Sequence, residues 1–183
     1  MRQARRERRG NTRKGIWMLK LSKRQVQKYL HRSYAAVDGL WFVKTEEKIG
    51  FRKALEIDKE VWKVMGKIQA RALKEFAGKS GAKDCFETKL QLDGFKFRSK
   101  KLKGGGFEIR IKSCPWRETL IKSGRKKYAE RIGSAICASE FPVWTREFGG
   151  ELSETGFELI SRICGGGKNC VFKFNASNEK NIR

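Results

Sequence analysis

The sequence predicts an α+β fold, in which a long N-terminal helical hairpin packs with an antiparallel sheet of about four strands and intervening helices. Two observations support this fold class. The first half of the chain carries apolar residues at three- and four-residue spacings, which are typical of amphipathic helices. The second half contains two pairs of segments in which apolar and charged residues alternate on either side of glycine-rich turns, as in β-hairpins.

A chain of 183 residues with 39% hydrophobic residues can form one domain with a substantial core. We expect this domain over residues 18–175. Residues 1–17 are rich in arginine and contain a single acid, Glu7, so they are expected to form a disordered basic extension. Met18 would make a natural start, and the extension is therefore expected not to belong to the natural protein. Residues 176–183 are polar and are expected to fray.

Two long helices are predicted in the first half. Ser22 and Gln25 form a capping box that opens the first helix, which ends at Gly50. The tight junction there indicates an antiparallel hairpin with the second helix, which ends at Gly78. In the first helix the residues at three- and four-residue spacings are Val26, Leu30, Ser33, Val37, Leu40, Trp41 and Lys44. The apolar stripe predicted for the second helix steps by three and four residues: Ala54, Ile57, Val61, Met65, Ile68, Ala72 and Phe76.

The second half is predicted to alternate hairpins and shorter helices. A helix is bent or interrupted at Pro142, and another begins at Pro115, because proline suits the first helical turn. The expected elements are a helix over 84–92 containing the packing residue Cys85, strands over 95–98 and 107–113, helices over 116–123 and 128–148, and strands over 157–164 and 170–175.

Four of the five cysteines lie between residues 114 and 174: Cys114, Cys137, Cys164 and Cys170. Their spacing matches no sequence-local zinc finger, so any shared site must be assembled by the fold. Cys114 is expected at a helix N-terminus, where unpaired N–H groups and the neighbouring Lys112 and Arg117 would favour a thiolate. The thiolate could serve as a metal ligand or as a nucleophile. All four cysteines could equally be small core residues.

Other residues could complete such a site. Glu140 lies three residues after Cys137 on a predicted helix, so both can project toward one point. Cys170 shares a strand face with Phe172 and Phe174 and should point inward. Asp38, Trp41 and Trp144 are candidates for an adjoining ligand pocket. The single histidine, His31, lies in a basic segment and makes a Cys-His dyad unlikely.

The net charge of +23 favours partners such as nucleic acid or acidic ligands. No apolar run is long enough to span a membrane, and no secretory signal is present, so a cytoplasmic protein without a membrane partner is expected. A basic nucleic-acid-associated protein without catalytic activity is the alternative function, and its binding would weaken steeply with salt. The two long helices could also support a homodimer.

Several motifs resemble one known family. The segments Cys114-Pro115-Trp116, Ile136-Cys137-Ala138-Ser139-Glu140 and residues 162–174, with Ala36-Val37-Asp38-Gly39-Leu40-Trp41-Phe42, are similar to the L-2-amino-thiazoline-4-carboxylic acid hydrolase-like family, in an uncharacterised branch. More distantly the layout resembles the 4-vinyl reductase domain, a small-molecule-sensing fold. Some of its members hold zinc with cysteines and a glutamate.

The resemblance implies a small-molecule-binding domain with a cysteine-rich site that holds zinc, or else iron. Cys114 would be a ligand or nucleophile, Glu140 a ligand or general base, and Cys137, Cys164 and Cys170 ligands or site wall. The domain would then hydrolyse a non-peptide C–N bond in a small cyclic amidine- or amide-type substrate, or would sense a ligand. The residues leave these two activities open.

Overall fold

A computed structural model describes residues 19–78, 80–103, 105–148 and 157–175. The predicted extension over 1–17 and the predicted tail over 176–183 lie outside the described residues. The chain divides into two units at Val37 and Asp38. None of the described helices is both long and apolar enough to cross a membrane.

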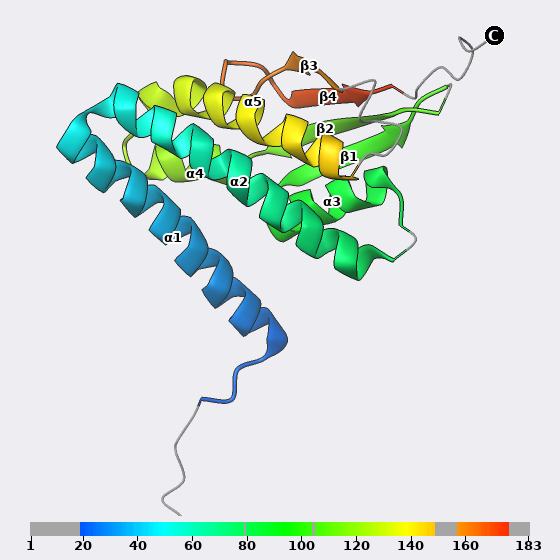
Figure 1. Cartoon of the computed structure of the whole chain (residues 1–183), viewed down its shortest axis with the longest axis horizontal. Coiled ribbons are helices and arrows are strands. Elements are labelled where there is room, and N and C mark those ends of the chain that lie inside the picture. The colour runs from blue at the N-terminus through cyan, green and yellow to red at the C-terminus, as the bar shows by residue number, and fades with distance from the viewer. Residues whose placement is uncertain (1–18, 79, 104, 149–156, 176–183) are drawn as a thin grey trace, which may run out of the picture. The chain divides into compact units, whose positions relative to one another are not determined.

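Helices and a four-stranded sheet follow one another largely as predicted (Figure 1). The fold class is therefore α+β, with two long N-terminal helices before an antiparallel sheet. The helices are α1 (Lys23–Ile49), α2 (Phe51–Ala77), α3 (Ala82–Leu92), α4 (Pro115–Lys122) and α5 (Ala129–Phe148), with a short 3₁₀ helix η1 (Lys126–Tyr128); the strands are β1 (Lys96–Lys101), β2 (Phe107–Ser113), β3 (Phe157–Ser161) and β4 (Cys170–Phe174).

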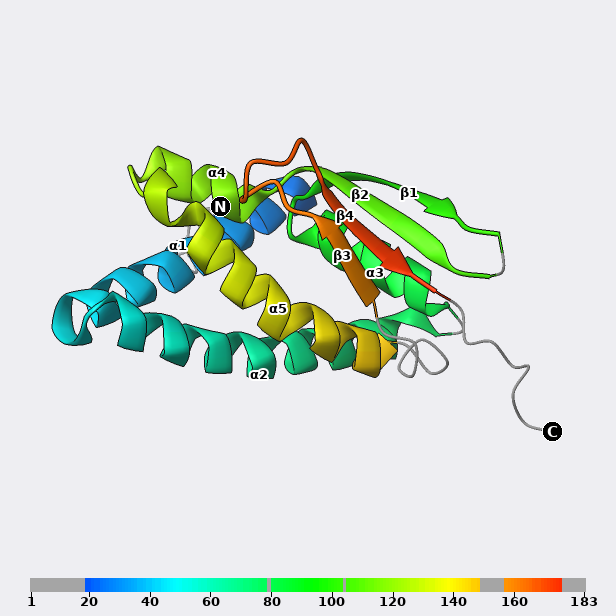
Figure 2. The same cartoon turned by 90° about the horizontal axis from the view of Figure 1, so that it is seen from above.

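The sheet has the strand order β1-β2-β4-β3, and every neighbouring pair is antiparallel. Ile109 and Phe172, which face each other across β2 and β4, are both buried. Helices α2, α3 and α5 cover this face of the sheet (Figure 2) and contribute Ala70, Phe86 and Trp144 to the same core. The alternation of apolar and charged residues gives β2 one buried face, as predicted, whereas β4 also buries Val171 on its other face.

The predicted helix boundaries hold where local chemistry sets them. Gln25 Oε1 accepts a hydrogen bond from the Ser22 backbone N–H at 2.8 Å, and Ser22 Oγ accepts one from the Gln25 N–H at 3.3 Å, which completes the capping box. Gly50, at φ 81°, is the single residue between α1 and α2. The sequence predicted that the helix over 128–148 would be bent or interrupted at Pro142. Helix α5 continues through Pro142, so the predicted interruption is wrong.

The buried face of α2 differs from the predicted stripe. Only Ala54 of the predicted residues is fully buried, whereas Ile57, Val61, Ile68 and Phe76 are exposed. In α1 the predicted stripe is exposed as well, and Phe42 is the buried residue. The face of α2 that packs in the core includes Leu55, Trp62, Gly66 and Ala70. The glycine and the alanine are small, so α5 can approach α2 closely there.

Gly106 should be essential to the sheet. A Cβ atom at Gly106 would lie 2.2 Å from the Phe174 carbonyl oxygen, so alanine would push β2 and β4 apart. We expect Gly106→Ala to lower the free energy of unfolding by about 2 kcal/mol or more in urea titrations. Gly39→Ala is the matched control, because nothing lies within 4 Å of its Cβ position in α1. It should stabilise the protein by up to about 1 kcal/mol, and equal effects of the two substitutions would contradict this account.

Candidate functional site

The end of the sheet brings three cysteines together. Cys170, the first residue of β4, pairs with Ile111 near the end of β2, and Cys114 follows three residues after Ile111. Cys164 lies in the turn between β3 and β4. The Ile163 N–H donates a hydrogen bond to Cys170 Sγ at 3.2 Å, which ties this turn to the start of β4. The strand register therefore gathers thiols that are far apart in the sequence.

Helix α5 adds the fourth thiol. A Cβ atom at Gly133 would lie 3.1 Å from Cys164 Sγ, so the turn rests directly on this part of α5. Cys137 follows Gly133 by one helical turn and lies on the same side of the helix. Its pKa is raised well above the ordinary value, first by burial and then by Cys114, Glu140, Cys170 and Cys164. The other three thiols thus lie within electrostatic reach of Cys137.

The thiolate predicted at Cys114 is not favoured. Cys114 does precede helix α4, as predicted, but no side-chain hydrogen bond caps the helix. Burial raises the pKa of the Cys114 thiol to about 11, although the backbone N–H groups of Arg117 and Trp116 act to lower it, and Cys170 and Cys164 raise it further. Desolvation outweighs the helix terminus here. At neutral pH the side chain is a neutral thiol and a poor nucleophile.

The four sulfur atoms do not already form a ligand set. Among the described residues, no three Cys, His, Asp or Glu side chains are arranged to hold a metal ion. All five cysteines are free. Cys85 belongs to the same hydrophobic core as Phe86 and Cys170, but no other thiol contributes to its pKa shift. We refer to Cys114, Cys137, Cys164 and Cys170 as the thiol cluster.

Glu140 is buried beside the thiol cluster, with only 6% of the residue exposed. Its Oε1 atom has no hydrogen-bond partner among the described residues. Burial raises the pKa of Glu140 to about 8; Lys89 acts to lower it, and Asp93 and Asp38 raise it. Lys89 forms an ion pair with Asp93, and its Nζ lies 4.4 Å from the centre of the Trp144 ring. A neutral carboxylic acid in this position can both donate and accept a hydrogen bond.

Two further acids lie on α1 and α2. Asp38 and Asp58 both form hydrogen bonds with the Trp62 side chain, and burial raises their pKa values to about 6 and about 7. The charge of Asp38 contributes to the shift of Asp58. The Trp62 ring contacts Trp116 edge to face, with centroids 5.3 Å apart. Trp116 lies two residues after Cys114, so this contact connects the acids to the thiol cluster.

The predicted pocket residues have different positions. Trp144 is buried beside Glu140, and Asp38 is half-buried, but 65% of Trp41 is exposed. The sequence interpretation missed Asp58, Trp62 and Lys89. An available signal was the four-residue spacing of Asp58, Trp62 and Gly66, which places an acid, an indole and a gap on one face of α2.

An open depression of about 580 Å³ lies where α2 meets the first turns of α5. None of the predicted site residues lines it. Its lining combines basic, acidic and small side chains from α2, η1 and α5: Leu55, Lys127, Glu130, Arg131, Ser134 and Ala135.

Comparisons with known proteins give one match. Residues 19–99 match a family of unknown function, DUF6125, over less than half of the chain. No curated protein and no solved structure matches. The matched span contains Asp38, Asp58, Trp62 and Lys89, whereas the thiol cluster and Glu140 lie beyond it.

The buried acids should make stability depend on pH. A carboxyl group whose pKa is higher in the folded state stabilises the fold below its unfolded value of 3.8, and this contribution is lost as the pH rises through the folded value. For Asp58 that value is about 7. Asp58→Asn should therefore have a smaller effect at pH 5, where only part of this contribution has been lost. At pH 8 it should raise the free energy of unfolding by about 1 kcal/mol, an amount reduced for partial solvent exposure.

Urea unfolding at the two pH values measures this difference. Glu75→Gln, at an exposed acid of the same helix, is the matched control for the loss of one carboxylate from α2. A gain of stability at pH 5 that equals the gain at pH 8 would contradict the burial of an ionisable Asp58.

Proposed function

We propose that this protein binds a small molecule next to a thiol-ligated metal centre, with zinc as the metal and Cys114, Cys137, Cys164 and Cys170 as its ligands. The observation that carries the proposal is the meeting of four thiols from separate parts of the chain at one end of the sheet. Four thiolates are a common ligand set for tetrahedral zinc, and iron accepts the same set.

The chemistry of the thiol cluster supports a cation at this place. Burial and mutual repulsion raise the pKa values of Cys114, Cys137 and Cys170 in the same direction. A bound cation would reverse this repulsion and release the thiol protons. The hydrogen bond from the Ile163 N–H to Cys170 Sγ would also stabilise a thiolate. Rotation of the cysteine side chains would be needed to bring the sulfur atoms into one ligand set.

The acids next to the thiol cluster support a polar ligand. Glu140 has a buried oxygen atom without a partner among the described residues, and such an atom is costly unless a ligand or water satisfies it. Asp38 and Asp58 continue the polar interior toward α1, with Trp62 between them and the thiol cluster. Tryptophan and carboxylate side chains together suit a small ligand with a flat polar group.

Metal content tests the proposal directly. Protein purified without an affinity tag under reducing conditions should contain near-stoichiometric zinc or iron by mass spectrometry. Cys114→Ser and Cys170→Ser should each reduce the metal content at least tenfold, because each removes one of four ligands. Cys85→Ala is the matched control, since Cys85 is a core residue outside the thiol cluster, and its metal content should equal that of the wild type. Stable wild-type protein that contains no metal would contradict the proposed metal centre.

Hydrolysis and ligand sensing can be separated at Glu140. Zinc needs an open position to polarise a substrate carbon–nitrogen group or to activate water, so in a hydrolase three of the four thiols would bind it and Glu140 would move the proton. Zinc held by all four thiols would be a closed, structural site beside the ligand. For a hydrolase, Glu140→Gln should reduce turnover of small cyclic amidines at least 100-fold while metal content stays unchanged. For a sensor, the wild type should bind these compounds in calorimetry without turnover. Neither binding nor turnover across a chemically varied panel would argue against a cyclic amidine ligand.

A further inference from the structure

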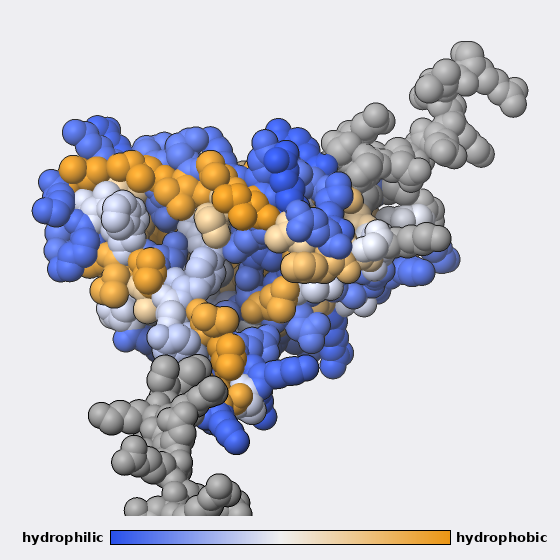
Figure 3. All heavy atoms as spheres, turned by 60° about the horizontal axis from the view of Figure 1, so that its bottom comes forward, coloured by the Kyte–Doolittle hydropathy of each residue, from blue (hydrophilic) through white to orange (hydrophobic). Residues whose placement is uncertain are grey.

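The net charge of +23 does not by itself mark a binding site. Hydrophilic side chains are spread over the face seen in Figure 3, with apolar patches between them. A specific site for an anion needs cations that converge on a hollow. The depression of about 580 Å³ between α2 and the first turns of α5 is such a hollow. Its volume lies within the range of about 300–1,000 Å³ that is usual for small-molecule sites.

Two basic side chains line this depression. Lys127 lies in η1, and Arg131 lies in the first turn of α5. Neither forms an ion pair with any other residue that the structure describes. Both side chains are exposed, so an anion can reach them from solvent.

A stacked pair of aromatic rings positions these two bases. Phe51, the first residue of α2, stacks on Tyr128, with 4.8 Å between the ring centroids. The guanidinium carbon of Arg131 lies 4.7 Å from the centre of the Phe51 ring, and Lys127 Nζ lies 5.0 Å from the centre of the Tyr128 ring. Cation–π contacts hold both charges close to the depression before a ligand arrives. Such preorganisation lowers the entropy cost of binding.

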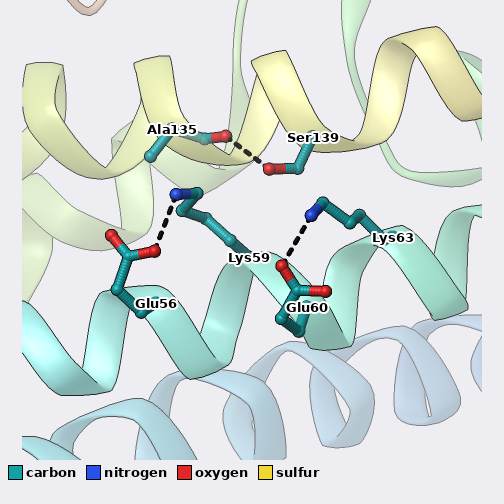
Figure 4. A network of polar contacts seen from close by, with 6 residues as sticks. All are labelled: Glu56, Lys59, Glu60, Lys63, Ala135 and Ser139. Carbon is teal, nitrogen blue, oxygen red and sulfur yellow. Dashed lines mark hydrogen bonds and ion pairs between the residues drawn. The ribbon is translucent and has the colours of Figure 1, made fainter.

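The neighbouring bases are already paired with acids. Arg125 forms an ion pair with Glu46. Lys59 extends from α2 toward Ala135 on α5 (Figure 4), and its Nζ lies 2.8 Å from a carboxylate oxygen of Glu56. The two bases in the lining of the depression are therefore the ones available to an anionic ligand.

The other lining residues restrict the chemistry of the ligand. Ser134 can donate a hydrogen bond to an anionic oxygen, and Leu55 and Ala135 provide apolar contact. Glu130 is the acid of the lining, and its Oε1 atom would lie 3.3 Å from a Cβ atom at Gly165. The carboxylate thus lies beside the turn between β3 and β4, where it can accept a hydrogen bond from a hydroxyl group. The lining therefore suits a ligand that carries both an anionic group and hydroxyl groups.

We propose that this depression binds a small phosphomonoester with hydroxyl groups, such as a sugar phosphate, and that Lys127 and Arg131 contact the phosphate. A guanidinium group presents a fork of N–H donors that matches phosphate oxygens, and lysine adds a point charge. A phosphomonoester carries about two negative charges at neutral pH, which two bases balance. Nucleic acid is instead bound by a stripe of bases along its backbone. The proposed phosphate site is separate from the thiol cluster and adds to the function proposed above.

Isothermal titration calorimetry on the full chain tests this site, in phosphate-free buffer of low ionic strength with ribose 5-phosphate as the probe. The wild type should bind ribose 5-phosphate, should bind inorganic phosphate more weakly, and should not bind ribose. Arg131→Gln and Lys127→Gln should each weaken binding about tenfold or more, because each removes a charge-assisted hydrogen bond. Arg146→Gln is the matched control. It removes the same charge from an exposed position of α5 about 22 Å farther along the helix, and should leave the affinity nearly unchanged.

Ser134→Phe tests the hollow itself. The larger side chain would fill the depression without a change of charge, so it should abolish binding while circular dichroism shows the helical content and melting temperature of the wild type. A wild type that does not bind ribose 5-phosphate, or that binds only a single-stranded oligouridylate, would overturn the proposal. Unchanged affinity in Arg131→Gln or Ser134→Phe would also overturn it, as would equal weakening by Arg131→Gln and Arg146→Gln. Because the phosphate site does not need the proposed metal centre, chelation should leave the affinity unchanged.

Discussion

The close approach of α5 to α2 at Gly66 controls the geometry of the candidate site. A Cβ atom there would lie 3.1 Å from Trp144 Nε1 and 3.3 Å from Glu140 Cγ, so any larger residue would separate the helices. This contact limits how closely α2 and α5 approach each other beside Glu140. Cys137 lies one helical turn before Glu140 on α5, so the same approach bears on both residues. A change at Gly66 should therefore affect both the acids and the thiol cluster.

Burial gives the site an unusual electrostatic character within a strongly basic protein. The pKa values of Asp38, Asp58, Glu140 and Cys114 all rise, and desolvation is the largest cause for each. Glu140 and Cys114 therefore carry protons at neutral pH, whereas Asp38, with a pKa of about 6, is mainly ionised. A metal ion or a cationic ligand would replace these protons, so its binding should be coupled to proton release. The same cost of burial explains why a helix N-terminus does not make Cys114 a thiolate.

Helix α2 has two apolar faces. Trp62 and Gly66 are buried, and Gly66 lies against α5, whereas Val61 and Val64 are exposed. A helix with two apolar faces satisfies a three- and four-residue periodicity in more than one way. For this reason the sequence pattern correctly predicted the helix but selected a stripe that the core leaves exposed. The core-facing side of α2 is marked by the small residues Gly66 and Ala70. A search for regularly spaced large apolar residues does not detect that side.

Local sequence was sufficient for the elements and for several of their ends, although β1 runs to Lys101 instead of residue 98 and β3 ends at Ser161 instead of residue 164. The Ser22 capping box, the junction at Gly50, the helix start at Pro115 and the alternation in β2 and β4 all depend on residues a few positions apart. The convergence of the cysteines, the meeting of Asp58 with Asp38 and the direction of the Cys114 pKa shift could not be obtained in this way. They depend on strand register, helix approach and burial, which arise only when distant segments pack together.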